Sequence, residues 1–377
     1  MTSRIRELAA GTPEMAALFD DAATLAAALR FEAALARACA DEGLVPKAAA
    51  AAIEAACREP LEAEAMAREA AHAGTLAIPL VAALRLRAGE AGRHAHLGAT
   101  SQDLADTVLM LQAQAGRRLI EDEVDRLLPA LASLAEAHAA TPMIGRTLLQ
   151  QARPITFGLK AAVWLQLAHG AARRFRREAD EAIRLQFGGA AGARHDLGGR
   201  GAAVAGRLAA TLGLPPALPW HARRDGVAGL AAALAILTGA AAKIARDVSL
   251  LAQNEVAEAF EPETEGRGGS SAMPNKRNPT GCQVALSAGL RAPHLASTIL
   301  SALPQEHERG LGGWQAEGPV LAELFLLTHG ALASMRQVVE GLELDPAAMA
   351  AKLDDRDAGE SEALARAAVA AWRKGTD

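Results

Sequence analysis

The stretch VAGLAAALAILTGAAA, from Val227 to Ala242, runs for 16 residues without a charged side chain. Alanine and leucine favour helices, and no proline interrupts the longer span between Pro219 and Pro262. A membrane-spanning helix needs roughly 20 apolar residues, so this stretch is too short for one. It predicts instead a helix that other helices bury on all sides.

The composition of the whole chain agrees with this prediction. Of its 377 residues, 51% are hydrophobic but only 3% are aromatic, and tyrosine is absent. Sheets prefer aromatic and β-branched residues, so this mixture favours an all-α fold. We expect five long helices that pack as an elongated bundle and bury their apolar stripes on one another. Their expected ranges are 101 toward 140 with a kink or break at Pro129, Pro154 to Gly188–Gly189, a span within 219–262, 281–303 and 315–342.

Shorter helices are expected before residue 99. Residues 14–58 are typical of two helices separated by EGLVPK, and more short helices follow to about Gly92. We therefore divide the chain into an N-terminal helical domain at 1–98, a central long-helix bundle at 99–344 and a short C-terminal remnant at 345–377. The remnant is too short for an independent domain. Because Ala-rich helices leave apolar surface for a partner subunit, we expect an oligomer.

Charge and cysteine content argue against several classes of protein. The formal net charge of −5 gives no overall attraction to nucleic acid or to an anionic membrane. Cys39, Cys57 and Cys282 form no C-x-x-C pair and show no metal-ligand spacing, so we expect reduced thiols in the cytoplasm. The N-terminal MTSRIRELAAGTPEM lacks the apolar segment of a secretory signal.

Four polar islands interrupt the apolar helices. The first, HAHLGATSQDLADT, spans His94 to Thr107, and its Thr100-x-x-Asp103 pattern resembles a capping box. Such a pattern is most often only a helix N-terminus. That end also offers free N–H groups and a positive dipole to an anion, and Thr100 and Ser101 would add hydroxyl donors.

The second and fourth islands carry more polar residues than a turn needs. The second is GRTLLQQARPITFG (Gly145–Gly158), for which surface solvation is an equally good interpretation. The fourth is QEHERGLGGWQAE (Gln305–Glu317), which taken alone is typical of an exposed helix end. The polar side chains in question are Arg146, Thr147, Gln150, Gln151 and Arg153 in the second island, and His307, Glu308 and Arg309 in the fourth.

The third island, GSSAMPNKRNP, spans Gly269 to Pro279 and combines backbone freedom, hydroxyls and cations. This mixture indicates a loop that closes over an anion. A further Gly-rich stretch, FGGAAGARHDLGGRG (Phe187–Gly201), follows a helix rather than a strand and has no P-loop lysine. We therefore expect no nucleotide site there, and His195 and Asp196 are expected on the loop surface.

Together the islands resemble the fumarase/aspartase superfamily. GSSAMPNKRNP is similar to its signature loop, and HLGATSQDLADT and GRTLLQQARPITFG are similar to its two other shared regions, in the same order. The resemblance covers roughly residues 15–345. It implies a long-helix bundle with a truncated C-terminal domain, assembled as a homotetramer whose active sites draw on three subunits, and a small polycarboxylate as substrate.

Within the superfamily, LQFGGAAG, LPWHARRD and QEHERGLGGWQAE are most similar to the cycloisomerase branch. This resemblance implies lactonisation of 3-carboxy-cis,cis-muconate to 4-carboxymuconolactone in protocatechuate degradation, with no metal and no organic cofactor. It implies Ser270 and Lys276 as the catalytic residues, with Ser271 next to them. The implied substrate-binding residues are His96, Thr100, Ser101, Arg146, Thr147, Gln150, Asn278 and Arg309.

Leu148 departs from the superfamily pattern, because many members have a histidine there. A lyase that expels an amine or hydroxide benefits from a general acid, whereas a carboxylate with a pKa of about 4 needs no proton. Leu148 therefore favours lactonisation. Two alternatives remain open, namely an adenylosuccinate- or argininosuccinate-type lyase and an inactive member of the superfamily.

Overall fold

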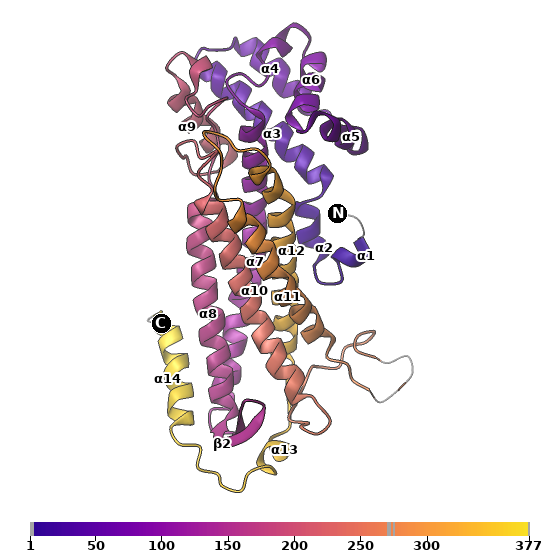
Figure 1. Cartoon of the computed structure of the whole chain (residues 1–377), viewed down its shortest axis with the longest axis vertical. Helices are drawn as coiled ribbons and strands as arrows, with labels where there is room; N and C mark the ends of the chain where they lie inside the picture. Colours follow the sequence, from indigo (N-terminus) through magenta and orange to yellow (C-terminus); the bar gives the residue numbers. More distant parts are fainter. Residues whose placement is uncertain (1–3, 270–272, 274–275, 376–377) are drawn as a thin grey trace.

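Five long helices form an elongated bundle, as the sequence predicts (Figure 1). The fold is described here from a computed structural model for residues 4–269, 273 and 276–375. Helix α10 packs against α8, α11 and α12, while α7 packs against α8 and α12. The all-α prediction is confirmed. The five helices are α7 (Ser101–Ala137), α8 (Phe157–Ala182), α10 (Asp225–Leu251), α11 (Thr280–Ser301) and α12 (Gly313–Glu340).

Helix α10 contains the uncharged stretch and lies in the core, where Leu230 and Leu234 are fully buried. By length and composition α10 and α12 could each cross a bilayer, yet 61% and 72% of their most apolar windows are buried inside the protein. They are core helices. Ile236 is nevertheless 45% exposed, so the prediction that α10 is buried on all sides is wrong for a single chain.

Helix α8 differs most from its expected range. Pro154 lies in strand β2 (Gln150–Thr156), and the helix begins at Phe157, where the Thr156 side chain accepts a hydrogen bond from Leu159 N at 3.2 Å. This N-cap sets the start. The helix ends at Ala182 instead of Gly188, because the following segment is extended and buries Leu185 and Phe187. Helix α7 continues through Pro129, so the expected break is absent.

The N-terminal region forms three helices over residues 13–56 where the sequence predicts two. Asp20 caps the second of them, accepting a hydrogen bond from Ala23 N at 2.8 Å, and so separates it from the first. Helices α3 to α6 and α9 gather at one end of the bundle (Figure 1). The elements are α1 (Arg4–Glu7), α2 (Pro13–Leu18), α3 (Asp21–Asp41), α4 (Lys47–Ala56), α5 (Ala63–Ala73), α6 (Ala77–Arg87), the 3-10 turns η1 (Gly89–His94) and η2 (His195–Leu197), and α9 (Gly201–Leu212).

The opposite end of the bundle carries the short β-structure. β1 (Pro142–Thr147) and β2 form an antiparallel hairpin, and β3 (Ala259–Phe260) pairs with β4 (Glu343–Leu344). After α13 (Pro346–Ala350), the last helix α14 (Ser361–Lys374) packs along α8 (Figure 1). The C-terminal residues are thus an addition to the bundle.

Candidate functional site

The first polar island ends at the N-terminus of α7. Thr100 is the N-cap, with extended backbone, and donates its backbone N–H to Asp103 Oδ2 at 3.0 Å, as the capping-box pattern predicts. The first N–H groups of a helix lack intrahelical partners, and the dipole makes this end positive. Thr100 and Ser101 are half-buried, so both keep part of their surface in contact with solvent.

Arg309, from the fourth polar island, reaches this helix end. It lies in the connection between α11 and α12, is exposed, and donates from Nη1 to Thr100 Oγ1 across 209 residues of sequence. A guanidinium beside helix N–H groups suits a carboxylate, because both donate hydrogen bonds to it. The structure therefore brings Thr100, Ser101 and Arg309 together.

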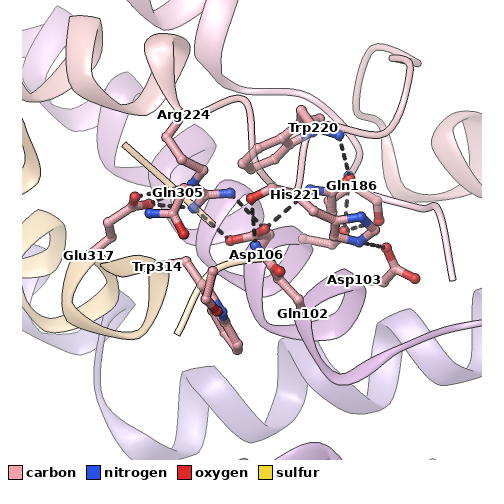
Figure 2. Close-up of polar contacts among 12 residues, drawn as sticks. Gln102, Asp103, Asp106, Gln186, Trp220, His221, Arg224, Gln305, Trp314 and Glu317 are labelled. Atoms are coloured by element: carbon pink, nitrogen blue, oxygen red, sulfur yellow. Dashed lines mark hydrogen bonds and ion pairs between the residues drawn. The ribbon is translucent and has the colours of Figure 1, made fainter. Parts of the chain in front are cut away.

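Asp103 lies in the first turn of α7 and connects this helix end to His221 (Figure 2). Its carboxylate is fully buried and accepts hydrogen bonds from His221 Nε2 at 2.7 Å and from the backbone N–H groups of Gly188 and Gly189 at 2.8 Å each. A Cβ at Gly188 would lie 2.7 Å from Pro219. The glycines of this stretch thus allow close packing and bind a carboxylate of the protein itself.

A buried charge cluster joins three helices next to Asp103. The side chain of Arg224 is fully buried, donates to Asp106 at 2.8 and 2.9 Å and to Glu317 Oε1 at 3.1 Å, and lies 4.7 Å from the centre of the Trp220 ring (Figure 2). Burial raises the pKa of Glu317 and the neighbouring Asp106 adds to this, while Arg224 opposes it. Two carboxylates thus share one guanidinium.

His96 lies four residues before the helix end and contacts a carboxylate of α3. Its Nδ1 is 2.5 Å from Glu32 Oε1, and Glu32 is 1% exposed. Burial alone would lower the pKa of His96, but the Glu32 carboxylate outweighs burial, so the pKa is raised above the ordinary value. Protonation of this imidazole is therefore favoured close to the start of α7.

The second polar island lies on the β1–β2 hairpin. Arg146 forms a bidentate ion pair with the fully buried Glu258, at 2.7 and 2.8 Å. Its guanidinium is thus already engaged within the chain, and its role toward substrate stays a prediction. Thr147 and Gln150 are exposed and pair with each other at the tip of the hairpin.

The hairpin tip itself is strained and apolar. Leu148 and Leu149 form its two-residue turn with φ of 52° and 65°, and their side chains are 92% and 81% exposed. Positive φ at both positions is the geometry of a type I′ turn, which normally takes asparagine and glycine. Strain of this kind persists where function requires it, so the tip is a candidate contact with a partner or a ligand.

The third polar island is described only in part. Ser270 and Ser271 lie outside the described residues. The Lys276 side chain is exposed and lines a cavity of about 340 Å³ together with Glu261 and Asn278. Asn278 donates its backbone N–H to Gly268 O at 2.9 Å and its side chain to Gly269 O at 3.3 Å, which closes the base of the loop.

The four islands lie at two opposite ends of the bundle. The first and fourth meet at the start of α7, whereas the second follows the end of α7 and the described residues of the third (269, 273 and 276–279) precede α11 (Figure 1). Helix α7, with 37 residues at 1.5 Å each, spans about 55 Å between the first and second islands. Helix α11, whose 22 residues span about 33 Å, runs from just after Lys276 toward the fourth island. Within one chain, Lys276 and Arg146 therefore cannot act on the substrate that Arg309 and Thr100 would bind.

Sequence reasoning missed the buried residues behind the helix end. Asp103 was considered only as a helix cap, and His221, Arg224, Asp106 and Glu317 were not singled out. The available signal is charge inside apolar helices, as in SQDLADT, but Asp103 meets its partners Gly188 and His221 85 and 118 residues away. Over the described ranges, no group of three His, Cys, Asp or Glu side chains is placed to hold a metal ion.

Comparison with known proteins gives one consistent result. A family model described as "Lyase" matches residues 7–293. The 3-carboxy-cis,cis-muconate cycloisomerase of Bradyrhizobium diazoefficiens is 49% identical over 90% of this chain and 77% of its own. The nitrosuccinate lyase of Streptomyces davaonensis is 44% identical over 92% and 75%. The crystal structure of the 3-carboxy-cis,cis-muconate lactonizing enzyme from Pseudomonas putida superimposes with a TM-score of 0.88 at 43% identity, covering 100% of this chain and 84% of that one.

Proposed function

Because the chain belongs to the lyase family of the fumarase/aspartase superfamily, we propose that it is a cycloisomerase that converts 3-carboxy-cis,cis-muconate to 4-carboxymuconolactone. The similarity to cycloisomerases over nearly the whole chain carries this conclusion. The free cysteines Cys39, Cys57 and Cys282 suit a reducing compartment, which supports a role in the cytoplasm.

The reaction is an internal conjugate addition. One substrate carboxylate attacks a carbon of the diene, and a proton is delivered to the carbon beside another carboxylate. Negative charge builds on that second carboxylate as an enediolate-like species. Stabilising this charge with fixed donors and cations is the main electrostatic task of the site.

The start of α7 supplies such donors. Thr100, Ser101 and the first N–H groups of the helix lie beside Arg309 and close to His96. Asp103 and the Arg224 cluster fix the position of the helix end through buried contacts. The N–H and hydroxyl donors of the helix end are therefore oriented before the substrate binds. We assign substrate carboxylate binding to this end. Because the net charge of the chain is −5, an anionic substrate is attracted by these local donors and not by the protein as a whole.

The third polar island supplies the proton carrier in this proposal. We assign it to Ser270, with Lys276 to lower the pKa of the hydroxyl and Asn278 to hold the loop. Since helices of about 33 to 55 Å separate the two groups of residues within a chain, a complete site needs other copies. The exposed Leu148, Leu149 and Ile236 are the apolar surface that such copies would cover. We therefore propose a homotetramer with shared active sites.

Mixing two inactive variants should restore activity if the sites are shared. Ser270→Ala and Arg309→Ala each damage one end, so a tetramer reassembled from both contains some sites with two intact contributions. We expect steady-state activity well above that of either variant alone. The control is mixing without dissociation, which should restore nothing. Light scattering that shows a stable, active monomer would contradict both the tetramer and the shared site.

Leu148→His should not raise the rate of lactonisation. The carboxylate nucleophile is already anionic at neutral pH, so an added general acid has no proton to supply. Histidine tolerates the left-handed backbone at this position, where φ is 52°, so the variant should fold. We expect muconate turnover to fall modestly, measured by the loss of diene absorbance.

The same assay separates the alternative lyase reactions. The wild type should show little activity on adenylosuccinate and argininosuccinate, whose amine leaving groups need protonation. Nitrosuccinate belongs in the panel because a nitrosuccinate lyase is among the similar proteins. Efficient cleavage of any of the three with slow muconate turnover would replace the lactonisation proposal by a lyase assignment.

A further inference from the structure

Glu32 is a buried carboxylate with incomplete hydrogen bonding. It lies on α3, in the N-terminal helices, and its side chain has no exposed surface. Oε1 accepts from His96 Nδ1 at 2.5 Å, whereas Oε2 is buried without a hydrogen-bond partner among the described residues. Isolated buried carboxylates are costly, so a cation beside Glu32 is strongly favoured.

His96 is held in an uncommon conformation that directs it to Glu32. Its backbone φ is 65°, in the left-handed region, and it follows the 3-10 turn η1 immediately before Leu97 and Gly98. Non-glycine residues in this region cost free energy and are retained where the surroundings require them. The ring is 14% exposed, and its Nε2 has no hydrogen-bond partner within the described part of the chain. Because Nδ1 is engaged with Glu32, Nε2 is the ring nitrogen that remains for a ligand.

The other charged groups near His96 are few. Asp103 on α7 favours the protonated ring and Arg85 on α6 opposes it, and both act less strongly than Glu32. Cys39 and Cys57 also surround Glu32, and burial, followed by Glu32 itself, raises the pKa of each to about 12. Both thiols are therefore neutral, and Glu32 is the carboxylate that directly contacts the ring.

We propose that Glu32 is a positioning residue that keeps His96 as an imidazolium, with Nδ1–H donated to Glu32 and Nε2–H left to bind a substrate carboxylate at the start of α7. This assignment rests on the proposed function, because it needs an anionic substrate at that helix end. In this assignment His96 is a second cation in addition to Arg309. The residue that sets its charge, Glu32, lies on α3, which carries none of the polar islands.

Glu32→Gln tests this role because it keeps the shape and removes the charge. The raised pKa of His96 means that the imidazolium persists to higher pH in the wild type and is lost as pH rises through that value. Without Glu32 the pKa falls, so the alkaline limb of kcat/KM should move down by about one pH unit or more. At acid pH the variant should approach wild-type activity. Glu32→Asp should restore part of the shift.

Glu42→Gln is the matched control. Glu42 directly follows α3, the helix that carries Glu32, and its carboxylate pairs with Arg207 near the surface. Its pH profile should equal that of the wild type. His96→Gln should abolish the alkaline limb, and in that background Glu32→Gln should cause no further shift. Thermal melting and light scattering show whether each variant is assembled.

The outcomes separate this proposal from the function itself. An active wild type whose alkaline limb is unchanged in Glu32→Gln, or retained in His96→Gln, would overturn the role of Glu32. If Glu32→Gln fails to assemble, the His96→Gln profile decides. A wild type that does not lactonise 3-carboxy-cis,cis-muconate would instead overturn the proposed function.

Discussion

Replacing Ser270 by alanine should lower kcat by roughly 10²-fold or more, the usual contribution of a positioned acid–base group. The hydroxyl is the assigned carrier of the proton that moves to or from carbon. KM should change little, because Arg309, His96 and the helix end still bind the substrate carboxylates. Steady-state kinetics with 3-carboxy-cis,cis-muconate measure both constants.

Ser271→Ala is the control for this prediction, since it removes the same group from the adjacent position of the same loop. It should retain most of the activity. If Ser270→Ala turned over at a near-normal rate while Ser271→Ala did not, the proton carrier would be Ser271. If both variants were fully active, the loop would have no role in proton transfer.

Arg224→Met should destabilise the protein by about 3–5 kcal/mol, the typical result of removing one partner from a buried ion pair. Methionine keeps much of the volume but leaves Asp106 and Glu317 buried without a counter-ion. The shift in denaturation midpoint, followed by circular dichroism, measures the loss. The neighbouring Arg223, whose pair with Asp225 is about 69% and 70% exposed, provides the control, and Arg223→Ala should change stability little.

The sign of the pH dependence sharpens this test. In Arg224→Met, burial acts on Glu317 without the opposing guanidinium, so the pKa of Glu317 should rise further above its unfolded value. A buried carboxylate whose pKa is raised by folding destabilises the fold while it is charged, above its unfolded pKa. It destabilises the fold less as it becomes protonated. The deficit relative to wild type should therefore shrink as pH falls toward 5. A variant as stable as wild type at pH 7 would mean that the cluster does not hold α7, α10 and α12 together.

The long helices could be predicted because their signals are local. Runs of alanine and leucine between breakers predict α11 and α12 to within two residues of their observed bounds and confine α10 to the span between Pro219 and Pro262. Pro154 was misleading, since proline suits both a first helical turn and an edge strand, and Thr156 was the stronger cap. The division at Asp20 was missed because its capping side chain lies within an otherwise continuous apolar pattern.

The site could be predicted only in part, because its geometry depends on distant contacts. The polar islands identified Thr100, Ser101 and Arg309, which the fold brings together. No local pattern joins Asp103 to His221, or Arg224 to Glu317, because each pair meets through helix packing. The sequence also does not predict which islands lie at the same end of the bundle. The order of the islands along the chain does not determine which helix termini are neighbours in the fold.

The most direct test of the central claim is to give the purified wild type 3-carboxy-cis,cis-muconate without added metal or cofactor. The diene absorbance should disappear in an enzyme-dependent way, and nuclear magnetic resonance should identify 4-carboxymuconolactone as the product. Absorbance that stays constant with a correctly assembled, folded protein would contradict the assignment of this chain as a cycloisomerase.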